Sequence, residues 1–206
     1  MPDFSLVFLR PTSLEYCVNA SSAVRLLNQF GESLLHYAAA AGNGETVEYL
    51  LDQGLDADQA NANKWTPLLC VLTPAKSYDK GQTAARLAVA HLLLERGASA
   101  HVVTDEGWTP LHALATVRDV DATEEERTGV GAFAEELIER GTPVDAEASL
   151  TRCAEDRHMQ AYEDWELTPL QWAGRTGAID IFDVLMRHFA STEQAEPRPD
   201  EGGVRR

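Results

Sequence analysis

A short motif recurs along this chain of 206 residues, and it restricts the possible fold more than any other feature. The copies read Trp65-Thr66-Pro67-Leu68, Trp108-Thr109-Pro110-Leu111-His112, Leu167-Thr168-Pro169-Leu170 and, with Ser for Thr, Glu32-Ser33-Leu34-Leu35-His36-Tyr37-Ala38-Ala39. Short units of this kind cannot bury an apolar face alone, so they must stack on one another. The recurrence therefore predicts a row of similar units rather than a single globular core.

The residue types in the motif suit the beginning of a helix. A Thr or Ser hydroxyl accepts a hydrogen bond from an N–H at the helix N-terminus, and a following Pro has no N–H to satisfy. Gly42 and Gly177 each stand nine residues after the Ser or Thr, where they would end this first helix. A second, apolar helix is expected to end at a further glycine in three of the units, namely Gly54, Gly97 and Gly141. Twelve residues separate the first two of these glycines from the next Thr, which is long enough for a β-turn finger.

This pattern resembles the ankyrin-repeat family, whose Thr-Pro-Leu-His motif recurs with a period of about 33 residues. Ser33 and Thr66 are separated by that period. The resemblance implies a mainly α solenoid of about four repeats plus a degenerate N-terminal capping unit, with β-turn fingers and three insertions. The expected units are residues 12–31 (the cap), 32–63, 64–106, 107–163 and 164–190, followed by a disordered tail over residues 191–206.

Three insertions interrupt the regular period. Two of them, of about ten and about eleven residues, each lie between the first and the second helix of one unit. The two units are neighbours, and the insertions fall within residues 66–97 and 109–141. The third, roughly Ala148 to Glu163, lengthens a finger. Insertions in repeat arrays commonly line a binding face, but surface loops also tolerate them at little entropic cost. Both interpretations stay open.

The charge of the chain limits its partners. With 33 acidic and 17 basic residues, the net charge of −16 repels nucleic acid and anionic membranes, so neither is expected. A protein partner fits better, and a basic one is electrostatically the easiest, although an acidic balance also simply favours solubility. The sequence shows no signal peptide and no membrane span, and its three cysteines are scattered, which favours a cytoplasmic or nuclear protein. We expect no metal and no cofactor.

Trp65 and Trp108 each stand directly before the Thr of their repeat. In the family this finger position faces the partner, and tryptophan is frequent among interface hot spots. The alternative is that both rings pack along the neighbouring finger. The remaining candidate partner-binding residues are weaker and lie at nearby family contact positions: Trp165, Leu167, Asp105, Glu106 and Arg175.

The histidines point to structure rather than catalysis. His36 and His112 occupy the Thr-Pro-Leu-His position, where the family uses the ring to hold the turn. No His or Cys spacing specifies zinc. His158 and Asp156 lie in the irregular third insertion and form the weak alternative of a general acid–base pair.

The residues therefore predict an acidic ankyrin-repeat module that mediates protein–protein interaction through its concave and finger face. Two alternatives stay open. One is a small-molecule-binding protein or an unusual enzyme whose pocket is formed by the inserted loops of the central repeats. The other is an inhibitor or immunity-type protein that covers a basic target.

Overall fold

The computed structural model describes residues 26–73, 82–116, 123–149 and 166–195. Within these ranges the chain is mainly helical. The first helices of the units are α2 (Leu34–Ala40), α4 (Pro67–Leu72), α6 (Pro110–Leu114) and α8 (Pro169–Thr176), and the second helices are α3 (Gly44–Asp52), α5 (Thr83–Glu95), α7 (Glu124–Glu139) and α9 (Ile179–Ala195). The strands β1 (Ala148–Ser149) and β2 (Glu166–Leu167) pair antiparallel.

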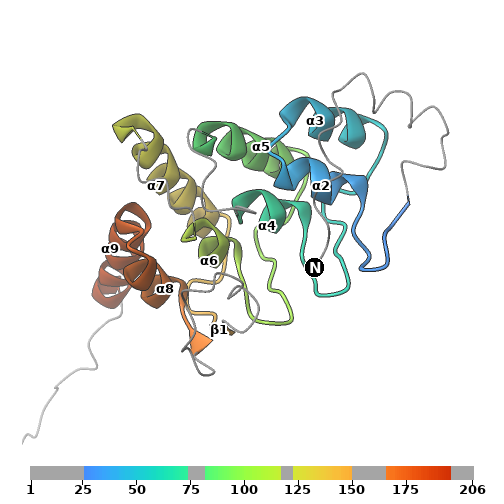
Figure 1. Cartoon of the computed structure of the whole chain (residues 1–206). Coiled ribbons are helices and arrows are strands. Elements are labelled where there is room, and N and C mark those ends of the chain that lie inside the picture. Colours follow the sequence, from blue (N-terminus) through green and yellow to red (C-terminus); the bar gives the residue numbers. More distant parts are fainter. Residues whose placement is uncertain (1–25, 74–81, 117–122, 150–165, 196–206) are drawn as a thin grey trace, which may run out of the picture.

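The helices form two layers. Figure 1 shows the short first helices along one row and the second helices along the other, with the connecting loops projecting away from the second row. Each helix packs on its partner within the unit and on the equivalent helix of the next unit, as α2 does on α3 and α4. This is the arrangement that the recurring motif predicts.

The motif residues begin the first helices as expected. The backbone of Thr109 is extended, and its hydroxyl accepts a hydrogen bond from the backbone N–H of His112. At the start of α8, the hydroxyl of Thr168 likewise accepts from the backbone N–H of Gln171, and the side chain of Gln171 accepts from the backbone N–H of Thr168. Pro67, Pro110 and Pro169 occupy the first helical position, where a missing N–H costs nothing.

The core is built from the same positions in successive units. Leu35, Leu68 and Leu111, which follow the Thr or Ser by two residues, are fully buried. The second helices contribute Leu50, Leu93 and Leu137, which are also fully buried. A stack of this kind distributes the burial of apolar surface over every junction between neighbouring units.

The fingers follow one another through backbone hydrogen bonds. The N–H of Ala62 donates to the carbonyl of Phe30 over 2.9 Å, and the N–H of Ser149 donates to the carbonyl of Glu106 over 2.8 Å. In β1 and β2, Ala148 stands opposite Leu167. The predicted fingers are therefore present as a stacked edge that adjoins the first helices.

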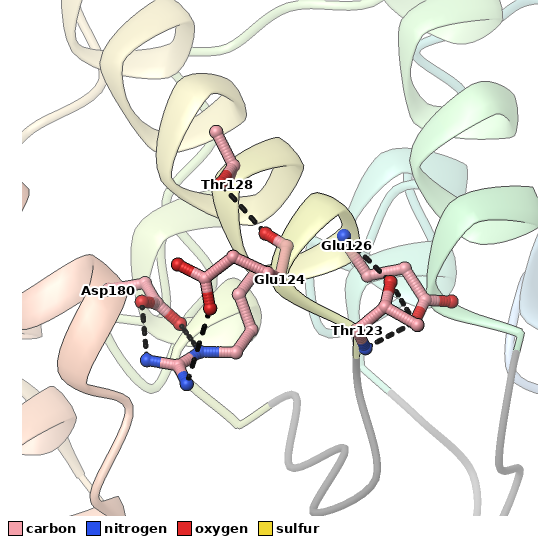
Figure 2. A network of polar contacts seen from close by, with 6 residues as sticks. Thr123, Glu124, Glu126, Thr128 and Asp180 are labelled. Atoms are coloured by element: carbon pink, nitrogen blue, oxygen red, sulfur yellow. Dashed lines mark hydrogen bonds and ion pairs between the residues drawn. The ribbon is translucent and has the colours of Figure 1, made fainter.

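Much of the second predicted insertion belongs to a helix. Its acidic run forms the first turn of α7, which has 16 residues against 9 in α3. Figure 2 shows the start of this helix, where Thr123 caps it and Glu126 accepts from the backbone N–H of Thr123 over 2.8 Å. Carboxylates in a first turn are favourable because the N-terminus of a helix carries partial positive charge. Most of the rest of the predicted insertions falls in residues 74–81, 117–122 and 150–165, which lie outside the described residues.

The expected boundary of the last unit needs adjustment. Residue 190 falls inside α9, which continues to Ala195. The hydroxyls of Ser191 and Thr192 donate to carbonyls one turn earlier, including that of Arg187 over 2.7 Å, so these polar residues extend the helix without adding to the core. Residues 196–206 lie outside the described residues.

Ion pairs connect neighbouring second helices. Figure 2 shows the pair between α7 and α9, in which the guanidinium of Arg127 donates to both carboxylate oxygens of Asp180 over 3.2 Å. At the end of α5, Arg96 forms ion pairs with Glu48 and Asp52 of α3, and the ring of His91 contacts Glu136 of α7 over 3.0 Å. Among the described residues, no helix has the length and apolar character needed to cross a membrane.

Candidate partner-binding face

One position of every unit lies at the base of its finger, directly before the Thr or Ser. Glu32, Trp65, Trp108 and Leu167 occupy this position in turn. The rings of Trp65 and Trp108 lie 6.1 Å apart between centroids, tilted by 35°. Trp172 of α8 meets Trp108 edge-on at 5.7 Å. The structure therefore brings three aromatic side chains together along the inner row of helices.

Trp108 is a core residue. Only 2% of it is exposed, and its indole N–H donates to the carbonyl of Ser149 over 3.2 Å. The ring has no surface left for a partner, because Trp172 and the neighbouring finger cover it. The prediction that Trp108 contacts a partner is therefore corrected, and the alternative of packing along the next finger describes its position.

Trp65 lies at the surface of the same row. It is half-buried, and it packs on the core through Trp108. Beside it, the ammonium of Lys64 forms an ion pair with Asp105 of the next finger over 2.8 Å, with 64% and 49% of the two side chains exposed. A half-exposed, well-supported indole next to an accessible carboxylate can contact a cationic group through its ring face.

Glu32 takes the equivalent position in the preceding unit. Its Oε2 accepts from Asn28 over 2.7 Å and from the hydroxyl of Tyr37 over 2.8 Å. Burial and this carboxylate raise the pKa of Tyr37. Tyr37 therefore stays protonated at neutral pH, and the carboxylate places negative charge at this end of the row.

Cys70 lies on α4 within the electrostatic influence of Glu32. Burial, assisted by this carboxylate, raises the pKa of its thiol to about 12. The thiolate is the reactive form of cysteine, so Cys70 is not an activated nucleophile. Its role here is that of a small apolar residue on α4.

His36 and His112 hold the fingers, as expected for this motif position. The Nε2 of His36 donates to the carbonyl of Trp65 over 3.1 Å, and that of His112 donates to the carbonyl of Leu167 over 2.9 Å. In each ring Nδ1 accepts from the backbone N–H of the Ser or Thr three residues earlier. Burial lowers the pKa of both, that of His112 to about 4, which leaves each imidazole neutral.

The other predicted site residues divide into two groups. Glu106 and Leu167 are half-buried along the fingers, and Arg175 is exposed on α8. Trp165, Asp156 and His158 lie outside the described residues, so the predicted acid–base pair stays a prediction. In the part of the chain that the structure describes, no three His, Cys, Asp or Glu side chains are grouped as a metal site requires.

A family model described as ankyrin repeats in three copies matches residues 10–73. The chain therefore contains ankyrin repeats over these residues. Diacylglycerol kinase iota of Homo sapiens is 35% identical to it over 91 residues, which cover 43% of this chain and 8% of the kinase. The Rattus norvegicus and Mus musculus kinases of the same name match over the same length at 35% and 34% identity. The chain thus spans about 8% of the length of these curated relatives.

Sequence reasoning missed Glu32, Tyr37 and Lys64 as members of this ankyrin-repeat surface. A signal for Lys64 was present. Gly31 and Gly107 hold its position in the neighbouring fingers, and all three residues have positive φ, 62° in the case of Lys64. A lysine in this conformation is unusual, because the left-handed region favours glycine. The lysine side chain therefore stands at a position whose backbone conformation costs energy.

Proposed function

We propose that this protein is a binding module that recognises a basic segment of another protein. Its binding site is the finger face, which we define as Glu32, Tyr37, Lys64, Trp65 and Asp105. Ankyrin repeats generally mediate protein–protein interaction. The specific proposal rests on one observation, namely the half-buried Trp65 directly after Lys64, whose exposed ion pair with Asp105 extends to the next finger.

Trp65 has the properties of an interface anchor. Its contacts with Trp108 and the core fix the ring before any partner arrives, so little side-chain entropy is lost on binding. A Lys or Arg over the exposed ring face gains about 0.5–2 kcal/mol from the cation–π interaction. The Glu32 carboxylate lies one finger away and extends the attraction along the row.

The net charge supports the same partner. At −16, the chain attracts a basic segment over long range and increases its association rate at low salt. Lys64 opposes a cation locally, but its ion pair with Asp105 is exposed and can exchange. A partner guanidinium that replaces Lys64 at Asp105 would form two hydrogen bonds where an ammonium forms one.

The kinase activity in the name of the matched relatives is no part of this proposal. The similarity reaches only 8% of their length. Among the described residues, the buried histidines are neutral and hold fingers, and Cys70 is a protonated thiol. The described finger face is therefore suited to binding rather than to proton transfer or nucleophilic attack.

The test compares Trp65→Ala with a matched control in the second layer of helices. Tyr49→Ala removes an equally half-buried aromatic side chain from α3, away from the finger face. Wild type and both variants are immobilised, and partners captured from a native extract are quantified and identified. We expect Trp65→Ala to reduce capture of the specific partner by at least about tenfold and Tyr49→Ala to leave it unchanged.

A second measurement addresses the charge of the partner directly. Synthetic peptides rich in Lys and Arg, and matched peptides rich in Glu, are titrated while binding is followed by calorimetry. Binding of the basic set alone, weakened by added salt and by Trp65→Ala, supports the proposal. Unchanged capture by Trp65→Ala, while both variants melt cooperatively, would exclude the finger face as the site.

A further inference from the structure

The side of α9 that faces away from α7 carries an apolar stripe. Ile179 and Met186 are 60% and 47% exposed, and Phe182 and Phe189 are half-buried. Their spacing of three and four residues places all four on one side of the helix. Figure 1 shows α9 and α8 at one end of the row of helices. Neighbouring exposed apolar side chains of this kind often mark an interaction surface.

The equivalent positions of the preceding units show what such a stripe is suited to contact. Phe182 stands five residues after Gly177, as Val47 stands five residues after Gly42. Val47 is fully buried, and α3, which carries it, packs on α5 of the following unit. Ala90 in α5 and Ala134 in α7 occupy the same position of their helices as Val47 does in α3, and both are fully buried too. The stripe of α9 therefore has the character of a junction between neighbouring units.

We propose that α9 binds a second copy of this chain through this stripe, which we define as Ile179, Phe182, Met186 and Phe189. The two α9 helices would run antiparallel about a two-fold axis. An isologous interface of this kind uses the same surface on both partners and closes as a dimer.

Local charge permits this contact although the chain as a whole is acidic. Residues 168–192 contain Asp180 and Asp183 against Arg175 and Arg187, which gives no net charge where the whole chain carries −16. Two copies therefore repel each other at long range but not across this surface. Added salt screens the long-range repulsion, so self-association should become tighter as ionic strength rises.

The charged residues beside the stripe complement themselves. Asp183 and Arg187 are four residues apart and both exposed. In an antiparallel pair with its axis near Leu185, Asp183 of one copy lies opposite Arg187 of the other. Arg187 also contacts Glu135 over 3.0 Å, but a guanidinium has donors for both carboxylates.

The chain's own C-terminal residues are a poor substitute for a second copy. Residues 196–206 read Glu-Pro-Arg-Pro-Asp-Glu-Gly-Gly-Val-Arg-Arg, in which Val204 is the single aliphatic side chain. One valine cannot cover two phenylalanines, an isoleucine and a methionine, because burial energy follows the apolar area removed from water. A second α9 offers four matching side chains.

The first experiment is sedimentation velocity over about a hundredfold range of protein concentration, on the full chain. We expect wild type to convert from monomer to a discrete dimer. Met186→Lys should weaken this dimer by at least about tenfold, because it places an unpaired charge in the interface. Val103→Lys is the matched control, since Val103 is 39% exposed on a finger and should not affect association.

A charge exchange then tests the geometry. Asp183→Arg and Arg187→Asp should each weaken the dimer by juxtaposing like charges, and the double variant should recover most of the loss. The melting temperature of each variant is measured as well. This distinguishes destabilisation of the fold, caused by loss of the Arg187–Glu135 contact, from loss of the dimer interface.

Three outcomes overturn the proposal. A wild-type chain that stays monomeric at every concentration and salt excludes the dimer. An open-ended series of oligomers, weakened by Leu27→Lys at a leucine that is 51% exposed near the opposite end of the row, assigns the stripe to head-to-tail contact. Tighter association of a chain ending at Ala195 shows that residues 196–206 cover the stripe instead.

Discussion

The imidazole of His112 and the carbonyl of Leu167, 55 residues apart in the chain, are joined by a hydrogen bond of 2.9 Å. The same ring accepts from the backbone N–H of Thr109, at the start of its own helix, over 3.2 Å. One neutral side chain therefore fixes a helix start and a finger of the following unit at the same time. His36 makes the equivalent connection to Trp65.

This arrangement predicts acid sensitivity. Burial lowers the pKa of His112 from 6.5 to about 4, so below pH 6.5 the unfolded chain gains a proton that the folded chain refuses. The free energy of unfolding should fall as pH decreases through this window, with His112 contributing about 2 kcal/mol between pH 7 and pH 5. Protonation of Nδ1 would also remove the acceptor for Thr109.

His112→Gln is the matched test, because the chain itself uses Gln171 at this position beside Thr168. The variant should lose about 1–2 kcal/mol at pH 7, since the carbonyl of Leu167 loses its donor. It should also show a smaller loss between pH 7 and pH 5 than wild type in urea denaturation. Equal pH dependence in both proteins would mean that His112 is not held neutral by the fold.

The third unit lacks this histidine, and Leu69 takes its place. The hydroxyl of Thr66 is buried there and has no hydrogen-bond partner among the described residues. Thr66→Val should therefore change the free energy of unfolding by less than about 0.5 kcal/mol, or stabilise the fold. Thr109→Val should cost about 1–2 kcal/mol, because it removes a capping hydroxyl that pairs with His112 over 2.9 Å. Equal losses in the two variants would contradict this difference.

The sequence predicts what is determined locally. The starts of α4, α6 and α8 follow from Thr-Pro-Leu, because capping and the fixed φ of proline depend on residues within one turn. The resemblance to ankyrin repeats supplied the finger connections and the role of His36 and His112, which single helices would not have revealed.

Trp65 and Trp108 show where this reasoning ends. Both precede Thr-Pro-Leu, yet one ring is half-buried and the other is 2% exposed. The difference comes from Trp172 of the next unit and Ser149 of the next finger, which both contact Trp108. Contacts across such a distance in the chain leave no trace in the motif, so the sequence could not separate a surface residue from a core residue.

This difference in burial predicts a difference in stability. Trp108→Ala should lower the free energy of unfolding by about 3–5 kcal/mol, as expected for removal of a fully buried large side chain. Trp65→Ala should cost less than half as much, because part of its ring already contacts water. Urea denaturation of both variants measures the difference. If Trp65→Ala proved as destabilising as Trp108→Ala, loss of binding could not be assigned to a contact.

Arg86 is a buried cation that sequence reasoning did not single out. It is 6% exposed on α5, and its two terminal nitrogens donate to the carbonyls of Val71 over 2.9 Å and Ala40 over 3.1 Å. These carbonyls lie in the last turns of α4 and α2, where a helix carries partial negative charge. The guanidinium thereby joins two units at the ends of their first helices.

Arg86→Met keeps the length of the apolar stem and removes the donors. It should cost about 2–4 kcal/mol, because one buried and one partly buried carbonyl lose charged hydrogen bonds. Arg86→Lys should fall between Met and wild type, since a single ammonium nitrogen cannot reproduce the spread of a guanidinium. A Met variant as stable as wild type in urea denaturation would show that the contacts contribute nothing net.

Two glycines with similar backbone angles separate strain from crowding. Gly97 and Gly107 have φ of 97° and 85°. A Cβ on Gly97 would meet nothing within 4 Å, whereas one on Gly107 would lie 1.9 Å from the carbonyl oxygen of Glu147. Gly97→Ala should therefore cost about 1 kcal/mol, from the left-handed conformation alone. Gly107→Ala should cost about 3 kcal/mol or more, because the next finger must move as well.

Hydrogen exchange provides the specific readout: the amide of Ser149, which donates to Glu106, should lose protection in Gly107→Ala and keep it in Gly97→Ala. Equal protection in both variants would show that the finger adapts without moving away.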